Sequence, residues 1–234
     1  MFVSGEDTLR YRAKWDDPYS SHSLILVRAG DGRGRRLLDV GAAQGELAQR
    51  FTERGFEVTC IEGNPTLAKM AQDKCHQMIV ADLDRQLPVL EGRFDVIVYG
   101  DILEHLRNPM EVCVQLNRYL SPAGQIIVSV PNFVHLFVRL NVLIGRFEYM
   151  DRGILDRTHL RFFTLKTFRE FLSAAGLTVK EMIATPVPLL LVVPERYHGW
   201  WLRALHGLNA ALAKGWKTMF GYQFVAVARP GRVA

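Results

Sequence analysis

Short apolar runs alternate with helical patterns along most of this chain. Five runs lie between residues 36 and 130, at 36–40, 56–61, 78–81, 94–99 and 124–130. Two more follow, at residues 177–184 and 221–228. Runs that are apolar on both faces and separated by helices predict parallel strands with helices covering each side of the sheet. Right-handed crossovers then give a doubly wound α/β sheet, whose ligand is expected at the carboxyl ends of the strands.

The size and composition of the chain suit one globular domain. Its 234 residues, 49% hydrophobic and 23% charged, are enough for one large α/β core and few for two. We therefore expect a single domain over residues 1–234, with insertions at 131–163 and 185–220 where the strand–helix rhythm breaks. The formal net charge of +5 permits an anionic partner without requiring one.

The cysteines and the apolar segments bear on the cellular compartment of the protein. Cys60, Cys75 and Cys113 form no CxxC pair, which indicates reduced thiols of a cytoplasmic protein rather than a disulfide framework or a zinc site. Residues 1–12 are polar, and no uncharged apolar run reaches the about 18 residues that span a bilayer. We expect no membrane-spanning segment.

The segment LLDVGAAQG, residues 37–45, is the most informative part of the sequence. It joins a predicted strand to a helix through a turn in which Gly41 and Gly45 let the backbone approach a ligand closely. Glu62 ends the next predicted strand, about 20 residues on, where an acidic side chain can accept both hydroxyls of a ribose. The spacing is GxxxG rather than the GxGxxG of dinucleotide sites, and Asp39 suits a cationic ligand better than a pyrophosphate.

Four segments, in this order, resemble the class I S-adenosylmethionine-dependent methyltransferases. They are LLDVGAAQG (37–45), VTCIEGNP (58–65), FDVIVYGDILEHL (94–106) and LSPAGQIIVSVPN (120–132). The resemblance covers about residues 10–185 and the last strand. It implies a Rossmann-like, mostly parallel seven-stranded sheet with an antiparallel last strand, and S-adenosyl-L-methionine as the cofactor.

The resemblance implies a role for each matching residue of the first two segments. Asp39, Gly41 and Gly45 would hold the methionine part of the cofactor, and Glu62 would hold its ribose. Many members of the family have GxGxG in the first segment, whereas this chain has Ala43 at the central position.

The resemblance also implies contacts at the two ends of the cofactor. Asp82 would bond the adenine amino group, and Gly100 and Asp101 would lie beside the sulfonium. Residues 1–35, with Tyr11, Trp15 and Tyr19, would form an N-terminal lid, and the two insertions would line the acceptor side. Surface packing without cofactor contact is the alternative for the three lid aromatics.

Two histidines are candidate catalytic bases for a hydroxyl acceptor. His105 follows the fourth predicted strand, near the transferred methyl group, and His159 lies in the polar stretch DRTHLRFFT after the fifth strand. The alternatives are that Glu104 and His105 pack the loop, and that the DRTHLRFFT stretch is an ion-paired loop. Arg157 and Arg161 could instead meet an anionic acceptor. Glu104 and His105 alone make a poor metal site and no third ligand has a convincing spacing, so we expect no metal.

The second insertion contains a predicted amphipathic helix within residues 198–220. Its apolar face carries, at steps of three and four, Trp201, Leu205, Leu208, Leu212 and Trp216. Together with nearby basic residues, this pattern suits peripheral contact with a membrane. The alternatives are a helix that covers the acceptor pocket and a face of a homodimer.

Local similarities suggest contexts for the acceptor. Residues 145–177 resemble methyltransferases of bacterial cell-envelope glycan and natural-product pathways, and 128–147 resemble the methionine-biosynthesis W family, whose fold can serve as a partner protein. We interpret the chain as a methyltransferase that acts on oxygen of a small-molecule, sugar or lipid-linked acceptor. An accessory cofactor-binding subunit is the first alternative and a nicotinamide-dependent oxidoreductase the second. The modest charge, without a basic stripe, argues against nucleic acid as the acceptor.

Overall fold

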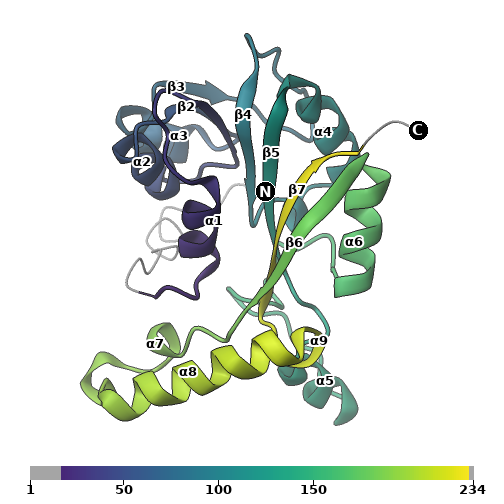
Figure 1. The fold of residues 1–234 in the computed structure, drawn as a ribbon. Helices are drawn as coiled ribbons and strands as arrows, with labels where there is room; N and C mark the ends of the chain where they lie inside the picture. The colour runs from purple at the N-terminus through teal and green to yellow at the C-terminus, as the bar shows by residue number, and fades with distance from the viewer. Residues whose placement is uncertain (1–16, 232–234) are drawn as a thin grey trace.

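A single seven-stranded sheet organises the computed structural model, which describes residues 17–231. Its strands lie in the order β3-β2-β1-β4-β5-β7-β6 (Figure 1). They are β1 (Arg36–Val40), β2 (Glu57–Glu62), β3 (Gln77–Val80), β4 (Phe94–Gly100), β5 (Leu120–Pro131), β6 (Leu177–Thr185) and β7 (Gln223–Pro230). Strands β1 to β5 pair in parallel, whereas β7 is antiparallel to both β5 and β6. The α/β sheet and its antiparallel last strand are confirmed.

Helices follow most of the strands, as the alternation predicts. The α-helices are α1 (Ser21–Ala29), α2 (Glu46–Glu53), α3 (Pro65–Ala71), α4 (Pro109–Leu116), α5 (Leu136–Leu143), α6 (Leu165–Ala174), α7 (Leu189–Val192), α8 (Trp200–Gly215) and α9 (Lys217–Phe220). Short 3-10 turns are η2 (Gln72–Lys74), η3 (Leu103–His105), η4 (Asn117–Tyr119) and η5 (Glu195–Tyr197). The Asn64 side chain caps α3 by accepting from the Thr66 and Leu67 backbone N–H groups, whereas Asn108 makes no side-chain cap bond at α4.

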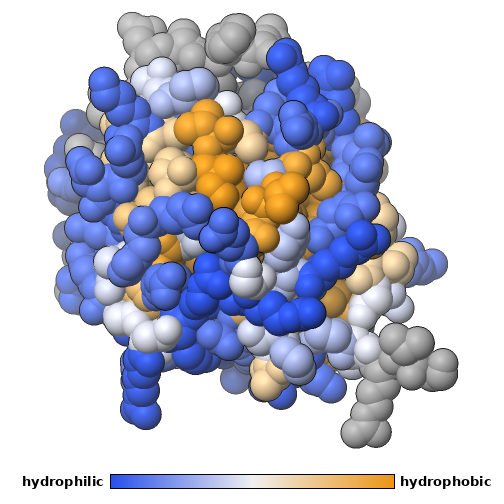
Figure 2. All heavy atoms as spheres, turned by 90° about the horizontal axis from the view of Figure 1, so that it is seen from above, coloured by the Kyte–Doolittle hydropathy of each residue, from blue (hydrophilic) through white to orange (hydrophobic). Residues whose placement is uncertain are grey.

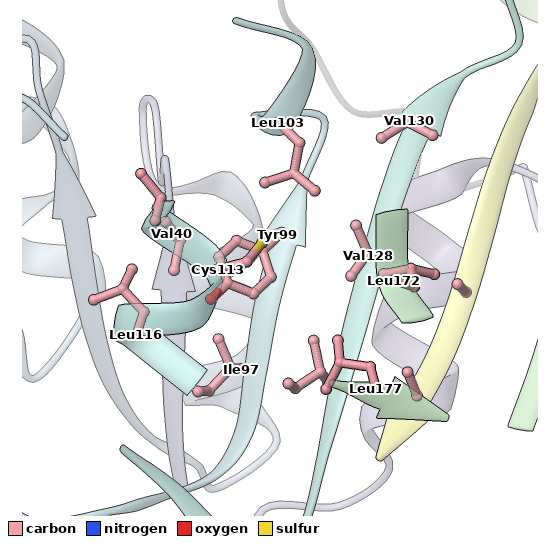
Figure 3. Packing of buried hydrophobic residues seen from close by; sticks show 14 of the residues in the cluster. Val40, Ile97, Tyr99, Leu103, Cys113, Leu116, Val128, Val130, Leu172 and Leu177 are labelled. Atoms are coloured by element: carbon pink, nitrogen blue, oxygen red, sulfur yellow. The ribbon is translucent and has the colours of Figure 1, made fainter. Parts of the chain in front are cut away.

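Side chains alternate between the two faces of the sheet and build a core on each. Ile97 and Tyr99 of β4 pack on one face with residues of α4 and α6 (Figure 3). Val96 and Val98 of the same strand pack on the other face with residues of α1 and α2. Because helices cover both faces, the middle of the central strand β4 is apolar on each side.

The two insertions gather α5, α8 and α9 at one end of the molecule, beyond the carboxyl ends of the parallel strands (Figure 1). In α8 the buried residues are Leu202, His206 and Ala213. The predicted apolar face of this helix is therefore not its buried face. The five residues of the predicted face, from Trp201 to Trp216, are between 43% and 58% exposed. Figure 2 looks down on the opposite end, where hydrophilic side chains surround a group of apolar residues. Within residues 17–231, no helix is long and apolar enough to cross a membrane.

Candidate active site

The turn between β1 and α2 is shaped by glycines in the left-handed region. Gly41 has a φ of 79°, and a Cβ there would lie 2.7 Å from Cγ1 of Ile102. Gly45 has a φ of 73°, and a Cβ there would lie 2.7 Å from Cβ of Ala71. Both glycines are therefore required by neighbouring protein atoms, in addition to any ligand that approaches the turn.

Ala43 also adopts a left-handed backbone, with a φ of 47°. An alanine pays about 1 kcal/mol or more for this conformation, whereas a glycine does not. A glycine at this position would adopt the same turn without that cost. Here the turn is held in place by a hydrogen bond from the Ala43 backbone N–H to Oε2 of Glu62, at 2.9 Å.

Glu62 stands at the end of β2, next to the end of β1. Its Oε2 accepts from Ala43, and its Oε1 accepts from the Asn64 backbone N–H at 2.8 Å. These two bonds point the carboxylate across the turn that contains the glycines. The orientation fits an acceptor for ribose hydroxyls at the carboxyl edge of the sheet.

Asp39 lies beside Glu62 and is almost fully enclosed. The residue is 3% exposed, and its Oδ2 has no hydrogen-bond partner among the described residues. Burial, followed by the negative charge of Glu62, raises the pKa of Asp39 to about 7. Two neighbouring acids, one of them with an unpaired buried oxygen, fit a positively charged ligand such as an ammonium or a sulfonium.

Asp39 makes a pH dependence the expected signature of this site. A cationic ligand favours the ionised carboxylate, and a pKa of about 7 leaves Asp39 mostly protonated below neutrality. Affinity for S-adenosylhomocysteine, which keeps the ammonium, should therefore rise about tenfold between one pH unit below and one unit above that pKa. Calorimetric titrations across this range test the effect. A pH-independent affinity, or the same dependence in Asp39→Asn, would exclude Asp39 as the titrating group.

The other predicted cofactor residues end the adjacent strands at the same edge. Asp82 follows β3, and its half-exposed side chain pairs with Arg85 at 3.2 Å. Gly100 ends β4, and Asp101 follows it with a φ of 51°. Because β1 to β4 are parallel, all seven predicted cofactor residues lie at their carboxyl ends or in the turns that follow.

Asp101 is held by two side chains to which the sequence assigns no role. Oγ of Ser129, from β5, donates to its Oδ1 at 2.7 Å. Nε2 of Gln223, from β7, donates to its Oδ2 at 2.9 Å. Ser129 falls inside the motif at 120–132, but nothing in the sequence indicates that β7 would bring Gln223 to the same carboxylate.

The two candidate bases meet beyond the end of β4. The backbone carbonyl of Glu104 accepts hydrogen bonds from the N–H groups of Leu160 and Arg161, at 2.8 and 3.0 Å. These bonds dock the loop after β5 against η3, and the ring centroids of His105 and His159 lie 4.8 Å apart. Glu104, His105 and His159 thereby place ligand-type atoms within 4.8 Å of one another. His159 is the group that the spacing in the sequence did not indicate.

Burial sets the protonation of this cluster. It lowers the pKa of both His105 and His159, so both rings are neutral at neutral pH. Burial also raises the pKa of Glu104 well above its ordinary value, and the nearby charge of Asp101 adds to the shift. Neutral imidazoles beside Asp101 can accept a proton or bind an electrophile.

Other predicted residues lie away from this cluster or outside the described chain. Tyr11 and Trp15 fall outside the described residues, and Tyr19 packs edge-on against His206 with ring centroids 5.5 Å apart. Arg157 pairs with Asp151 at 2.7 Å on the surface. This ion pair matches the alternative that the DRTHLRFFT stretch is an ion-paired loop.

Comparisons with known proteins show the family to which the chain belongs. A family model described as a methyltransferase domain matches residues 12–182. The ubiquinone biosynthesis O-methyltransferase of Acinetobacter baumannii (strain AYE) is 29% identical over 193 residues, which cover 73% of this chain and 79% of the relative. That of Alkalilimnicola ehrlichii is 34% identical over 137 residues, or 51% of this chain and 56% of the relative.

Solved structures share the fold at low sequence identity. A SAM-dependent methyltransferase from Archaeoglobus fulgidus has a TM-score of 0.60 and 18% identity, covering 95% of this chain and 96% of its own. The 1,6-didemethyltoxoflavin-N1-methyltransferase of Burkholderia thailandensis was solved with S-adenosylhomocysteine. It has a TM-score of 0.58 and 18% identity, and the match covers 97% of this chain and 84% of its own. With the family model spanning most of the chain and a carboxyl-edge site suited to a cationic nucleoside ligand, the chain belongs to the methyltransferase domain family and is a class I S-adenosylmethionine-dependent methyltransferase.

Proposed function

We propose that this methyltransferase acts on a hydroxyl oxygen of a lipophilic small molecule of the quinone type. The observation that carries the proposal is the buried cluster of Glu104, His105 and His159 next to Asp101. The similar proteins are named as ubiquinone biosynthesis O-methyltransferases. This supports oxygen as the methylated atom and a quinone-type ring as the acceptor.

In the proposed site the cofactor is held along the carboxyl edge of the sheet. The turn of Gly41 and Gly45 lies against the methionine part, and Asp39 pairs with its ammonium. Glu62 accepts the ribose hydroxyls, while Asp82 lies at the adenine end. Gly100 and Asp101 lie beside the sulfur. The buried, unpaired Oδ2 of Asp39 supports this orientation, since it supplies the negative charge that the cationic end of the ligand requires.

S-adenosylmethionine supplies the activated methyl group when it is bound. His159 and His105 promote loss of the proton from the acceptor hydroxyl, so that an oxygen lone pair is available to the methyl carbon. The low pKa values of the two histidines support this role, because both rings are unprotonated at neutral pH. Positioning of the two substrates supplies much of the remaining rate enhancement.

Acceptor screening tests the chemistry directly. The protein is incubated with methyl-labelled S-adenosylmethionine and a lipophilic dihydroxylated aromatic compound, beside the same compound with its hydroxyls already methylated. We expect label on oxygen in the first acceptor and none in the second. Label on nitrogen in amino analogues alone would contradict oxygen chemistry. Cofactor binding without turnover on any acceptor would favour an accessory subunit.

We also propose that α8 contacts a membrane surface that holds the acceptor. Residues 196–220 contain four basic residues and no acidic residue, and three of the four tryptophans of the chain, Trp200, Trp201 and Trp216. These tryptophans are 83%, 47% and 56% exposed. Exposed indole rings among basic side chains support an interfacial contact with anionic lipid.

Tryptophan fluorescence tests this contact without a label. Vesicles of phosphatidylglycerol should shift the emission to the blue, because the indole rings leave water, and neutral phosphatidylcholine vesicles should do so less. Leu208→Glu, on the exposed face of α8, should abolish the shift, whereas Val89→Glu, at another exposed apolar residue, should not. If the wild-type protein is a dimer in solution and the Leu208→Glu variant is a monomer, this face is instead an interface between two copies of the chain.

A further inference from the structure

We propose that Asp17 and His206 form a buried latch through which α8 positions the start of α1 against the sulfur end of the cofactor. Both residues are 3% exposed, and Nε2 of His206 lies 3.1 Å from each oxygen of the Asp17 carboxylate. Because a carboxylate only accepts, Nε2 carries the hydrogen and donates to both oxygens. The latch gives the second insertion a part in cofactor binding, and it rests on the proposed place of the sulfur beside Gly100 and Asp101.

The latch joins two segments that are far apart in the sequence. His206 lies within α8, whereas Asp17 lies in the turn that precedes α1, on the α8 side of that helix (Figure 1). The ring of Tyr19 packs edge-on against His206 with centroids 5.5 Å apart, and the Tyr19 backbone N–H donates to Oδ1 of Asp17 at 2.9 Å. The backbone N–H of Ser20 donates to the carbonyl of Asp17 at 3.2 Å. These contacts hold the turn and α8 together.

The turn leads directly to the carboxyl end of β4. Ser21 is the first residue of α1, and its Oγ donates to Oδ2 of Asp101 at 3.4 Å. Ile25 lies one helical turn further on, and a Cβ at Gly100 would be 3.8 Å from its Cδ1. Only three residues separate Asp17 from Ser21. A displaced Asp17 would therefore move the first turn of α1 away from Gly100 and Asp101.

A buried polar pair at this place specifies one arrangement of α8 more than it adds stability. An apolar pair of similar volume often stabilises a fold as much as a buried ion pair, because it carries no desolvation cost. Nδ1 of His206 is in addition buried without a hydrogen-bond partner among residues 17–231. Either group alone would be costly to bury, so α8 cannot rotate or slide past the turn without a large loss. Leu202 and Ala213 are also buried in α8, but apolar contacts are not directional and set no such register.

Removal of both partners tests the latch without leaving one polar group buried alone. The double variant Asp17→Ala with His206→Leu should fold, because both polar groups are lost together. We expect it to bind S-adenosylhomocysteine about tenfold more weakly than the wild type does, since one hydrogen bond to a charged group no longer holds the turn. The side chain of His206→Gln can still donate an N–H to Asp17, so this variant should keep its affinity within a factor of about three of the wild type.

Asn209→Ala is the matched control on the same helix. The Asn209 side chain donates to the backbone carbonyl of Val187 at 2.9 Å, so this change loosens α8 from its own insertion and leaves the latch intact. The control should bind S-adenosylhomocysteine as the wild type does. Thermal unfolding without ligand shows whether each variant is folded.

The possible results separate the latch from the cofactor site. Unchanged affinity in the folded double variant, or an equal loss in Asn209→Ala, overturns the latch. A double variant that does not fold overturns it as well, because the pair would then be a requirement of the fold. If Glu62→Ala loses affinity and the double variant does not, the latch fails and the cofactor site stands. A wild type without affinity for S-adenosylhomocysteine overturns the site and the latch together.

Discussion

Replacing His159 by alanine is expected to lower turnover about 100-fold. The ring is 8% exposed, and its Nδ1 is fixed by the carbonyl of Ile154, so the side chain is held beside His105. His105 remains after the change, but without His159 the site has one histidine instead of two. Steady-state kinetics with a hydroxylated acceptor measure the loss.

The matched control and the pH profile make this result specific. His198→Ala should leave turnover unchanged, and affinity for S-adenosylhomocysteine should be the same in both variants. Because burial lowers the pKa of His159, turnover should reach its plateau at a lower pH than a histidine with an ordinary pKa would give. Turnover within a factor of about two of the wild type in His159→Ala would exclude the role.

Replacing Glu62 by alanine is expected to weaken cofactor binding about 100-fold or more. Hydrogen bonds to a charged group contribute about 1.5–3 kcal/mol each, and the carboxylate would make two of them to the ribose. The same change removes the acceptor that anchors the Ala43 and Asn64 backbone N–H groups. Calorimetry with S-adenosylhomocysteine measures the affinity.

Glu57 provides the control for Glu62 on the same strand. It lies at the opposite end of β2, where its half-exposed side chain is 3.6 Å from Arg36. Glu57→Ala should bind the cofactor product as the wild type does. If Glu62→Ala also retains its affinity within a factor of about three, the ribose does not lie at this carboxylate.

Much of the sheet follows from the sequence because buried parallel strands leave a strong pattern. The runs at 36–40 and 94–99 match β1 and β4 to within one residue. β5 begins at Leu120, four residues before the predicted run, because Pro122 interrupts the apolar pattern ahead of residue 124. The direction of β7 came only from family resemblance, since a run that is apolar on both faces carries no information about direction.

Contacts between distant loops could not be predicted in the same way. His159 lies beside His105 because the Glu104 carbonyl accepts hydrogen bonds from backbone N–H groups of the loop after β5. Such bonds join main-chain atoms, which every residue type has, so the amino-acid sequence does not reveal them. The cofactor residues were easier to predict, because each follows a strand and parallel strands end at one edge.

The sequence also did not predict which face of α8 is buried. The steps of three and four identify a helical stripe, but they do not say whether protein or solvent covers it. In the fold, Leu202 and His206 face inward instead, and a hydrogen bond of 3.1 Å joins His206 to Asp17. The predicted apolar face of α8 therefore remains on the surface.

The most direct test of the central claim is calorimetric titration of the purified protein with S-adenosylhomocysteine, beside NADH and the Glu62→Ala variant. The geometry at the ends of β1 and β2 predicts one molecule bound per chain, weaker binding in the variant and no binding of NADH. Failure of the wild type to bind S-adenosylhomocysteine, or equal binding of NADH, would contradict a methyltransferase cofactor site at this edge.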